Sequence, residues 1–313
     1  MISILLIAGV SGIVILGVIF AFRSHKPTAA ELADAHARHQ QDLASYRQEL
    51  NDCLNGTGNF AQSGTPPSQC SQMLSGPPSD ESLYLNKVFL LDSLPDALLG
   101  VAFIVLVMAM LVGASAVGAE WSADSIATLL TWEPRRIRVL LTRMVAVAAA
   151  VVVMSIVLYL ALTLMFVVVS ALRGSTTTSS SWLNHVLVQI GRNTLIAVAI
   201  STIGVAVATV GRNTAAALGV LVGYMAIIEN LLRGLRPWTT PWLLGSSAAT
   251  YLSGHPTQVY LNNGPQVSGG DGSITYAPTV LTVTVEHALV VVIAYTVILS
   301  LIALVIFRRR DIT

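Results

Sequence analysis

The side chains that could do chemistry in this sequence are few, and three of them lie inside apolar stretches. Glu229 and Arg233 are four residues apart, so on a helix they can form an ion pair, and Arg192 belongs to an earlier apolar stretch. Ionisable groups within membrane segments often line a substrate path, which is one interpretation of these residues. In the other interpretation they are structural: the first two pair with each other, and the guanidinium of Arg192 reaches the lipid headgroups.

A second group has the spacing of metal ligands but not their number. His36, His39 and Asp42 would share one face of a helix, yet no fourth ligand is near them in the sequence, so a solvated helix face explains them better. The signatures of zinc proteases (H-E-x-x-H), serine hydrolases (G-x-S-x-G) and P-loop ATPases (G-x-x-x-x-G-K-S/T) do not occur. We therefore expect a non-enzymatic chain that binds no metal and no cofactor.

The amino-acid composition is that of a membrane protein, so the residues above are expected to lie on or between membrane-spanning elements. Of the 313 residues, 54% are hydrophobic and 11% are charged, whereas roughly 25% are charged in soluble domains. The net charge of +1, without a basic cluster, argues against a nucleic-acid binder. Six apolar runs reach the roughly 20 residues that a helix needs to cross a bilayer.

Lipid cannot satisfy backbone polar groups, so these runs must be helical. The first run lacks the basic start and the cleavage site of a signal peptide, and we expect it to be retained. We predict an all-α, polytopic, single transmembrane domain (residues 1–313) with these spans: Ile2 to Phe22, Ala97 to Gly118, Met144 to Leu172, Val186 to Val210, Ala215 to Leu235 and Glu286 to Phe307.

Arginines determine the expected orientation, because short cytoplasmic loops are enriched in positive charge. The richer set of connections contains Arg135, Arg136, Arg138, Arg143, Arg212, Arg308, Arg309 and Arg310, whereas the opposite set of short loops contains Arg173, Arg233 and Arg236. We therefore predict a multi-pass plasma-membrane protein with both termini in the cytoplasm. The segments 23–96, 173–185 and 236–285 would then lie outside the cell.

The outer segment 23–96 is longer than a simple loop. It begins with a polar stretch, residues 29–54, whose apolar side chains recur at helical spacing, and it continues as a loop rich in Gly, Ser and Pro. Cys53 and Cys70 both lie in this segment, where an oxidising exterior allows a disulfide. The alternative is two free thiols in a loop.

The outer segment 236–285 starts with two Pro-Trp pairs. Pro237, Trp238, Pro241 and Trp242 predict a broken helix that is interfacial or re-entrant, because tryptophan is enriched at the headgroup level. A polar run with four glycines follows, and it predicts an exposed, flexible loop.

The inner loop between the second and third spans, residues 119–143, has the most specific pattern. Trp121, Ser125 and the Leu129-Leu130 pair recur at helical spacing, which predicts an amphipathic helix along the membrane surface. Pro134 ends this helix, because the residue before a proline disfavours the α conformation. One interpretation is an ordinary interfacial helix that the following arginines hold at anionic headgroups.

This loop also resembles the coupling segment of type-2 ATP-binding-cassette (ABC) exporter permeases. In that family a Glu opens the amphipathic helix, a Leu-Leu pair follows, and a Pro-x-Arg turn leads to a basic residue before the next span. The matching residues here are Glu120, Trp121, Ser125, Leu129, Leu130, Pro134, Arg135, Arg136 and Arg143. The Thr-Trp-Glu-Pro-Arg-Arg turn is similar to the form in high-GC Gram-positive bacteria, while Asp124 departs from the usual Gly.

The resemblance covers most of the chain and implies the permease subunit of an ATP-driven exporter in a bacterial plasma membrane. A separate nucleotide-binding ATPase subunit would bind ATP and Mg and grip the helix in 119–143. A second permease chain, identical or homologous, would complete the pathway. The long segment 23–96 departs from the family pattern.

Two alternative functions stay open. One is a membrane-anchored structural or sensory protein that binds a partner through its extracellular segment. The other is a secondary transporter, which would need ionisable groups near the bilayer midplane. No short motif indicates the transported substrate.

Overall fold

A computed structural model describes residues 2–57, 70, 84, 89–122, 136–176, 178, 180–261, 266–268, 274–276 and 279–309. In this part of the chain, six helical segments are long and apolar enough to cross a membrane: Ser3–Arg23, Leu91–Ala119, Ile137–Arg173, Trp182–Gly211, Thr214–Leu235 and Val285–Arg309. Each coincides with one predicted span. The chain is therefore a multi-pass membrane protein.

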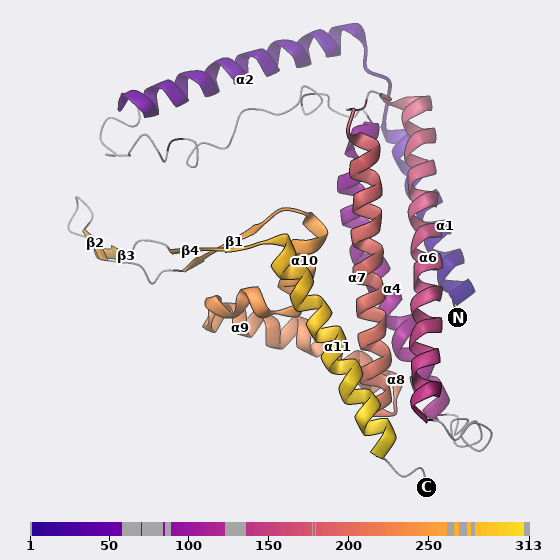
Figure 1. Ribbon diagram of the computed structural model, residues 1–313. Helices are drawn as coiled ribbons and strands as arrows, with labels where there is room; N and C mark the ends of the chain where they lie inside the picture. The colour runs from indigo at the N-terminus through magenta and orange to yellow at the C-terminus, as the bar shows by residue number, and fades with distance from the viewer. Residues whose placement is uncertain are drawn as a thin grey trace. The chain divides into compact units, whose positions relative to one another are not determined.

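The α-helices that build the spans are labelled in Figure 1. Five spans are single α-helices: α1 (Ile2–Arg23), α4 (Leu94–Ser122, preceded by the 3-10 turn η4, Leu91–Ser93), α6 (Arg136–Arg173), α7 (Trp182–Gly211) and α11 (Val285–Arg309). The fifth span in chain order is interrupted. It consists of α8 (Thr214–Gly223), the π-helical segment η5 (Tyr224–Ile228) and α9 (Glu229–Leu235).

The second and third spans extend farther into the inner loop than predicted. Because α4 continues to Ser122, Glu120 and Trp121 belong to the same helix as the second span. Likewise α6 begins at Arg136, so Arg143 lies within α6 rather than before it. Residues 123–135, which hold most of the predicted amphipathic helix, are outside the described part of the chain.

The chain divides into two compact units, and the larger one comprises Met1–Ser11, Leu94–Leu162 and Ser180–Thr313. Its central pair is α4 and α7, which pack side by side (Figure 1). A Cβ added at Gly113 of α4 would lie 2.1 Å from the carbonyl oxygen of Ser201 in α7. Small residues let two membrane helices approach this closely, so Gly113 is required by the packing.

Apolar side chains from five helices form the core of the larger unit. Four of them, α4, α7, α8 and α11, belong to the spans, and the other is α10 (Leu244–Ser253), a short helix between the fifth and sixth spans. The core contains Ala102 and Met110 of α4, Ile196, Ala199, Ile200 and Ile203 of α7, Leu221 of α8, Leu244, Ala248 and Leu252 of α10, and Val292 of α11.

The chain is all-helical in its spans, as predicted, and the segment between α9 and α11 adds short strands to its helices. After the 3-10 helix η6 (Pro237–Trp242) and α10, β1 (Thr257–Leu261) pairs antiparallel with β4 (Thr279–Val283). A second pair joins β2 (Gln266–Ser268) to β3 (Ile274–Tyr276). Thr and Val make up most of β4, and β1 contains Thr, Val and Tyr; β-branched and aromatic residues favour strands. The four glycines of the predicted flexible loop lie outside the described residues, and the described parts of that segment form two strand pairs.

The smaller unit comprises Gly12–Ser93 and Thr163–Ser179. The predicted polar helix is present as α2 (Ala29–Asn55). It begins with a capping box, in which the Thr28 hydroxyl accepts from the Glu31 N–H and the Glu31 carboxylate accepts from the Thr28 N–H. Elsewhere in this unit, the ring of Phe89 contacts Phe20 and Phe166, with centroids 5.5 Å and 4.6 Å away.

Candidate functional site

The predicted coupling residues fall into two groups. Glu120 and Trp121 lie in the last turn of α4, and Arg136 and Arg143 lie in the first turns of α6. The others lie outside the described residues: Ser125, Leu129, Leu130, Pro134 and Arg135. The structure therefore fixes the two helices that flank this loop, and the function of the loop stays a prediction.

The polar groups of the fifth span are organised around Glu229. This residue begins α9, directly after the π-helical segment, and its side chain is only 2% exposed. The Arg233 guanidinium donates to the Glu229 carboxylate at 2.5 Å, which is the i, i+4 pair expected from the sequence. Arg233 itself is 43% exposed, so this ion pair has one buried and one half-exposed partner.

Glu229 also binds the start of α10. Its two carboxylate oxygens accept from the N–H of Gly245 at 2.9 Å, the N–H of Ser246 at 2.6 Å and the Ser246 hydroxyl at 3.1 Å. The residue before α10, Leu243, is extended and offers no side-chain cap. The first N–H groups of a helix lack intrahelical partners and carry partial positive charge. The carboxylate of Glu229, which is distant in sequence but close in space, accepts their hydrogen bonds and offsets that charge.

The close approach of this carboxylate explains the glycine in the first turn of α10. A Cβ added at Gly245 would lie 2.6 Å from one carboxylate oxygen of Glu229 and 2.7 Å from the other. A Cβ atom is almost never found within 3.0 Å of such an atom, so any larger side chain would displace the carboxylate. Gly245 is therefore a requirement of the Glu229 site.

The other end of α10 contacts α7. The Gln189 amide donates to the carbonyl oxygen of Leu252 at 2.8 Å, in the last turn of α10. Gly254 ends the helix in the left-handed region, with φ of 72°. The Arg192 guanidinium occupies the space beside it, because a Cβ at Gly254 would lie 1.8 Å from Nη1. A cation is favourable at this end of a helix.

Gln189 and Asn193 extend the same network to α4. The Gln189 amide donates to the Asn193 side-chain oxygen at 3.0 Å, and the Asn193 amide donates to the carbonyl oxygen of Leu98, also at 3.0 Å. Both side chains are buried. Sequence analysis missed Gln189, although an i, i+4 pair of amides in an apolar helix could have suggested a buried hydrogen bond.

A third set of contacts joins η6 to the sixth span. The Trp242 ring packs edge-on against His287, with centroids 4.8 Å apart. His287 Nε2 lies 3.2 Å from the Pro241 carbonyl oxygen, so this nitrogen is the donor. The Tyr295 hydroxyl donates to the Trp242 carbonyl oxygen at 3.2 Å. An apolar pocket of about 340 Å³ lies beside them on α11.

These contacts place the three predicted pathway residues. Glu229 and Arg233 meet at the start of α10, and Arg192 lies at its end, so they do not form one cluster. Each is near an end of the same short helix, which is a structural arrangement. A role in a substrate path stays a prediction.

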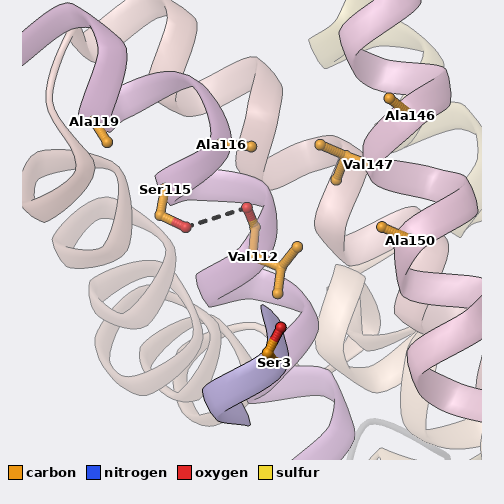
Figure 2. A pocket seen from close by; sticks show the side chains of 8 residues that line it. All are labelled: Ser3, Val112, Ser115, Ala116, Ala119, Ala146, Val147 and Ala150. Carbon is orange, nitrogen blue, oxygen red and sulfur yellow. Dashed lines mark hydrogen bonds between the residues drawn. The ribbon is translucent and has the colours of Figure 1, made fainter. Parts of the chain in front are cut away.

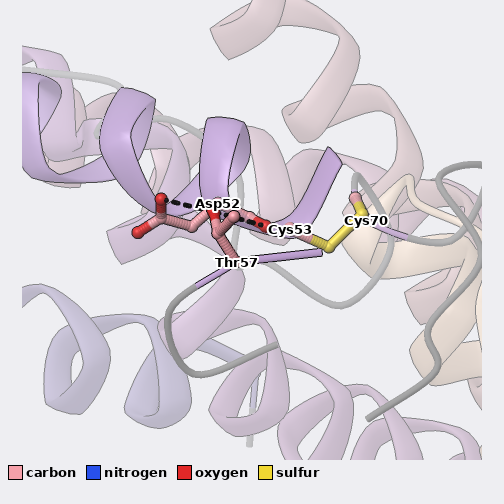
Figure 3. Close-up of a disulfide and its surroundings, with 4 residues drawn as sticks. All are labelled: Asp52, Cys53, Thr57 and Cys70. Atoms are coloured by element: carbon pink, nitrogen blue, oxygen red, sulfur yellow. Dashed lines mark hydrogen bonds between the residues drawn. A yellow bond between two sulfur atoms is a disulfide. The ribbon is translucent and has the colours of Figure 1, made fainter. Parts of the chain in front are cut away.

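The smaller unit contains the predicted disulfide. Figure 3 shows the bond between Cys53, near the end of α2, and Cys70. Beside it, Thr57 closes the helix end: its N–H donates to the Asp52 carbonyl oxygen at 2.8 Å and its hydroxyl to the Asp52 carboxylate at 3.0 Å. Gly56 between them is left-handed, with φ of 64°. The bridge links the C-terminal turn of α2 to the segment that follows.

The histidine face of α2 has partners other than a metal. The hydroxyl of Tyr84 donates to the Asp42 carboxylate at 2.5 Å, and this hydrogen bond raises the pKa of Tyr84. The Tyr84 ring lies 6.0 Å from that of His39. Within the described residues, no three His, Cys, Asp or Glu side chains come close enough to hold a metal ion.

Comparison with known proteins identifies a family but no function. No curated protein and no solved structure matches this chain. One protein family matches residues 82–313, and its description is "Protein of unknown function (DUF2705)". The match includes the inner loop, the α10 contacts and five of the six spans, and it leaves out α1, α2 and both cysteines. The chain therefore belongs to the DUF2705 family.

Proposed function

We propose that this chain is the transmembrane permease subunit of an ATP-driven ABC exporter. The observation that carries the proposal is the pattern of the loop 119–143. It combines Glu120, the Leu129-Leu130 pair and the Pro134-x-Arg136 turn between the second and third spans. ATP and Mg would bind to a separate nucleotide-binding subunit.

The helices that flank this loop are suited to carry a displacement into the membrane. Thirteen residues, 123–135, separate the end of α4 at Ser122 from the start of α6 at Arg136. A partner that grips them would therefore pull on two spans at once. Because α4 packs closely on α7 through Gly113, a shift of α4 would move α7 as well.

The expected assembly follows the same reasoning. The arginine-rich ends of the spans would face the cytoplasm of a bacterial cell, where an ATPase subunit can reach the loop, and both termini would lie on that side. A second permease chain, identical or homologous, would form the pathway with this one.

The proposal is tested by co-expressing the full-length chain with a candidate nucleotide-binding subunit. The purified complex is compared with a Glu120→Ala, Arg136→Ala double variant in pull-down and ATPase assays. The double variant should lose copurification or uncouple ATP hydrolysis. The matched control is Glu286→Ala with Arg173→Ala. This control also removes one carboxylate and one guanidinium. Glu286 lies in the first turn of α11 and Arg173 ends α6, so both are far along the chain from the loop 119–143, and both side chains are exposed.

Two results would reject the permease proposal: no nucleotide-binding subunit copurifies with the unchanged chain, or both double variants behave alike. A membrane-anchored protein that binds a partner through residues 23–96 would then be the better explanation. A secondary transporter has less support. Such a transporter needs buried ionisable groups that can bind a coupling ion. Glu229 is the one buried charged side chain among the described residues, and it is already bound to Arg233 and to α10.

A further inference from the structure

An open groove lies between α4 and α6 in the larger unit, near the ends of these helices that flank the inner loop. Its volume is about 560 Å³, within the range of roughly 300–1,000 Å³ of small-molecule sites. Figure 2 shows side chains of α4 facing those of α6 across the space. The lining consists of Ser3 of α1, Val112, Ser115, Ala116 and Ala119 of α4, and Ala146, Val147 and Ala150 of α6.

The lining residues are small, although the two helices do not use them for contact with each other. Small residues in membrane helices usually mark a close helix–helix approach. In α4 that approach is made to α7, at Gly113. The serine and alanines of α4 instead lie across an open space from the alanines of α6, and no lining side chain is larger than valine. The groove is thus a mainly apolar slot between the two helices.

A basic residue of α6, Arg143, lies about one turn before the first lining residue of that helix. Arg143 precedes Ala146, Val147 and Ala150 by three, four and seven residues, so it shares their face of α6. It is about 10 Å from the level of Ala150, at 1.5 Å per residue, and its side chain is half-buried. Between Arg136 and Arg143, α6 contains three arginines and no acidic residue.

We propose that this groove binds one anionic phospholipid. An acyl chain would lie along the small residues between α4 and α6, and the phosphate would bind Arg143 at the membrane surface. Basic pockets between transmembrane helices bind anionic headgroups, and each arginine near the surface favours an anionic lipid by a factor of about five. A neutral lipid would fill the same slot without this gain. The site lies wholly within this chain and does not depend on the proposed transport function.

The test is lipid retention by the purified, delipidated full-length chain, measured by native mass spectrometry without any ATPase subunit. Dioleoyl phosphatidylglycerol is compared with dioleoyl phosphatidylcholine. The unchanged chain should retain one phosphatidylglycerol about fivefold better. Arg143→Gln should remove this preference, and Ala146→Trp, which fills the slot, should remove retention of both lipids.

Matched controls lie on exposed positions of the same helix. Arg138→Gln and Ala149→Trp make the same chemical changes away from the groove and should retain the lipid as the unchanged chain does. Ala146→Leu repeats the filling test with a smaller side chain, in case the tryptophan variant does not fold.

Three results would overturn the proposal. Equal retention of the two lipids by the unchanged chain removes the role of the headgroup. Equal retention by Ala146→Trp and Ala149→Trp places the lipid elsewhere. A dimer that Ala146→Trp dissociates would mean that a second copy of the chain, not a lipid, covers the groove.

Discussion

Replacing Glu229 should detach α10 from the fifth span. In Glu229→Ala, the N–H groups of Gly245 and Ser246 lose their acceptor and Arg233 loses its partner. Each buried donor that is left without an acceptor costs about 1–3 kcal/mol, so the two N–H groups together give roughly 2–6 kcal/mol. The carboxylate is 2% exposed, so water cannot replace it, and we expect a loss in this range.

Two conservative variants separate the contributions. Glu229→Gln keeps one oxygen acceptor but loses the charge, and it should cost about 1.5–3 kcal/mol, the value of a hydrogen bond to a charged group. Arg233→Gln should cost less than either, because the buried carboxylate keeps its three donors at the start of α10 and loses only its half-exposed partner. The expected order of destabilisation is therefore Glu229→Ala, then Glu229→Gln, then Arg233→Gln.

The measurement is the free energy of unfolding of the purified full-length chain, from SDS titration in detergent micelles. Amide hydrogen exchange at Gly245 and Ser246 gives a local readout, and both amides should exchange faster in Glu229→Ala. Glu286→Ala is the control, since it removes an exposed carboxylate and should change stability by less than about 0.5 kcal/mol. If the two amides stay protected in Glu229→Ala, the carboxylate does not hold α10.

Three further perturbations have defined outcomes. Gly254→Ala should destabilise the chain by about 1 kcal/mol or more in the same titration, because it places a methyl group against Arg192 and strains a left-handed residue. Cys53→Ser with Cys70→Ser should lower the stability of the smaller unit by about 3 kcal/mol, seen as faster proteolysis after α2. The capping box lowers the pKa of Glu31 from 4.5 to about 2, chiefly through the Thr28 N–H, so its contribution to α2 is complete above pH 4.5 and lost as the pH falls through 2. Hydrogen exchange at the start of α2 should show this pH dependence, and Glu31→Gln should remove it.

Features that depend on local sequence were predictable. Apolar runs of about 20 residues identified the six spans, because length and hydropathy alone decide whether a helix can cross a bilayer. The pair of Glu229 and Arg233 was predictable for a similar reason, since residues four apart on a helix are neighbours. The disulfide was favoured because the two cysteines share one polar segment.

Features that depend on tertiary contacts were not predictable from the sequence. The other partners of Glu229 are backbone groups at Gly245 and Ser246, and no pattern in the sequence signals which helix start a buried carboxylate will meet. The strands β1 and β4 carried a signal in their Thr and Val residues. It was outweighed by the polar, glycine-containing sequence between them, which is typical of a loop.

The contacts around α10 also bear on how a displacement could cross the membrane. Asn193 of α7 binds the Leu98 carbonyl of α4, Gln189 of α7 binds the Leu252 carbonyl of α10, and Glu229 binds the first turn of α10. These bonds form one chain from α4 through α7 and α10 to α9. If a partner subunit moves α4 as proposed, α10 must either follow α7 and α9 together or break buried hydrogen bonds that cost about 1–3 kcal/mol each. Motion of α10 as one body with these helices is therefore the less costly path.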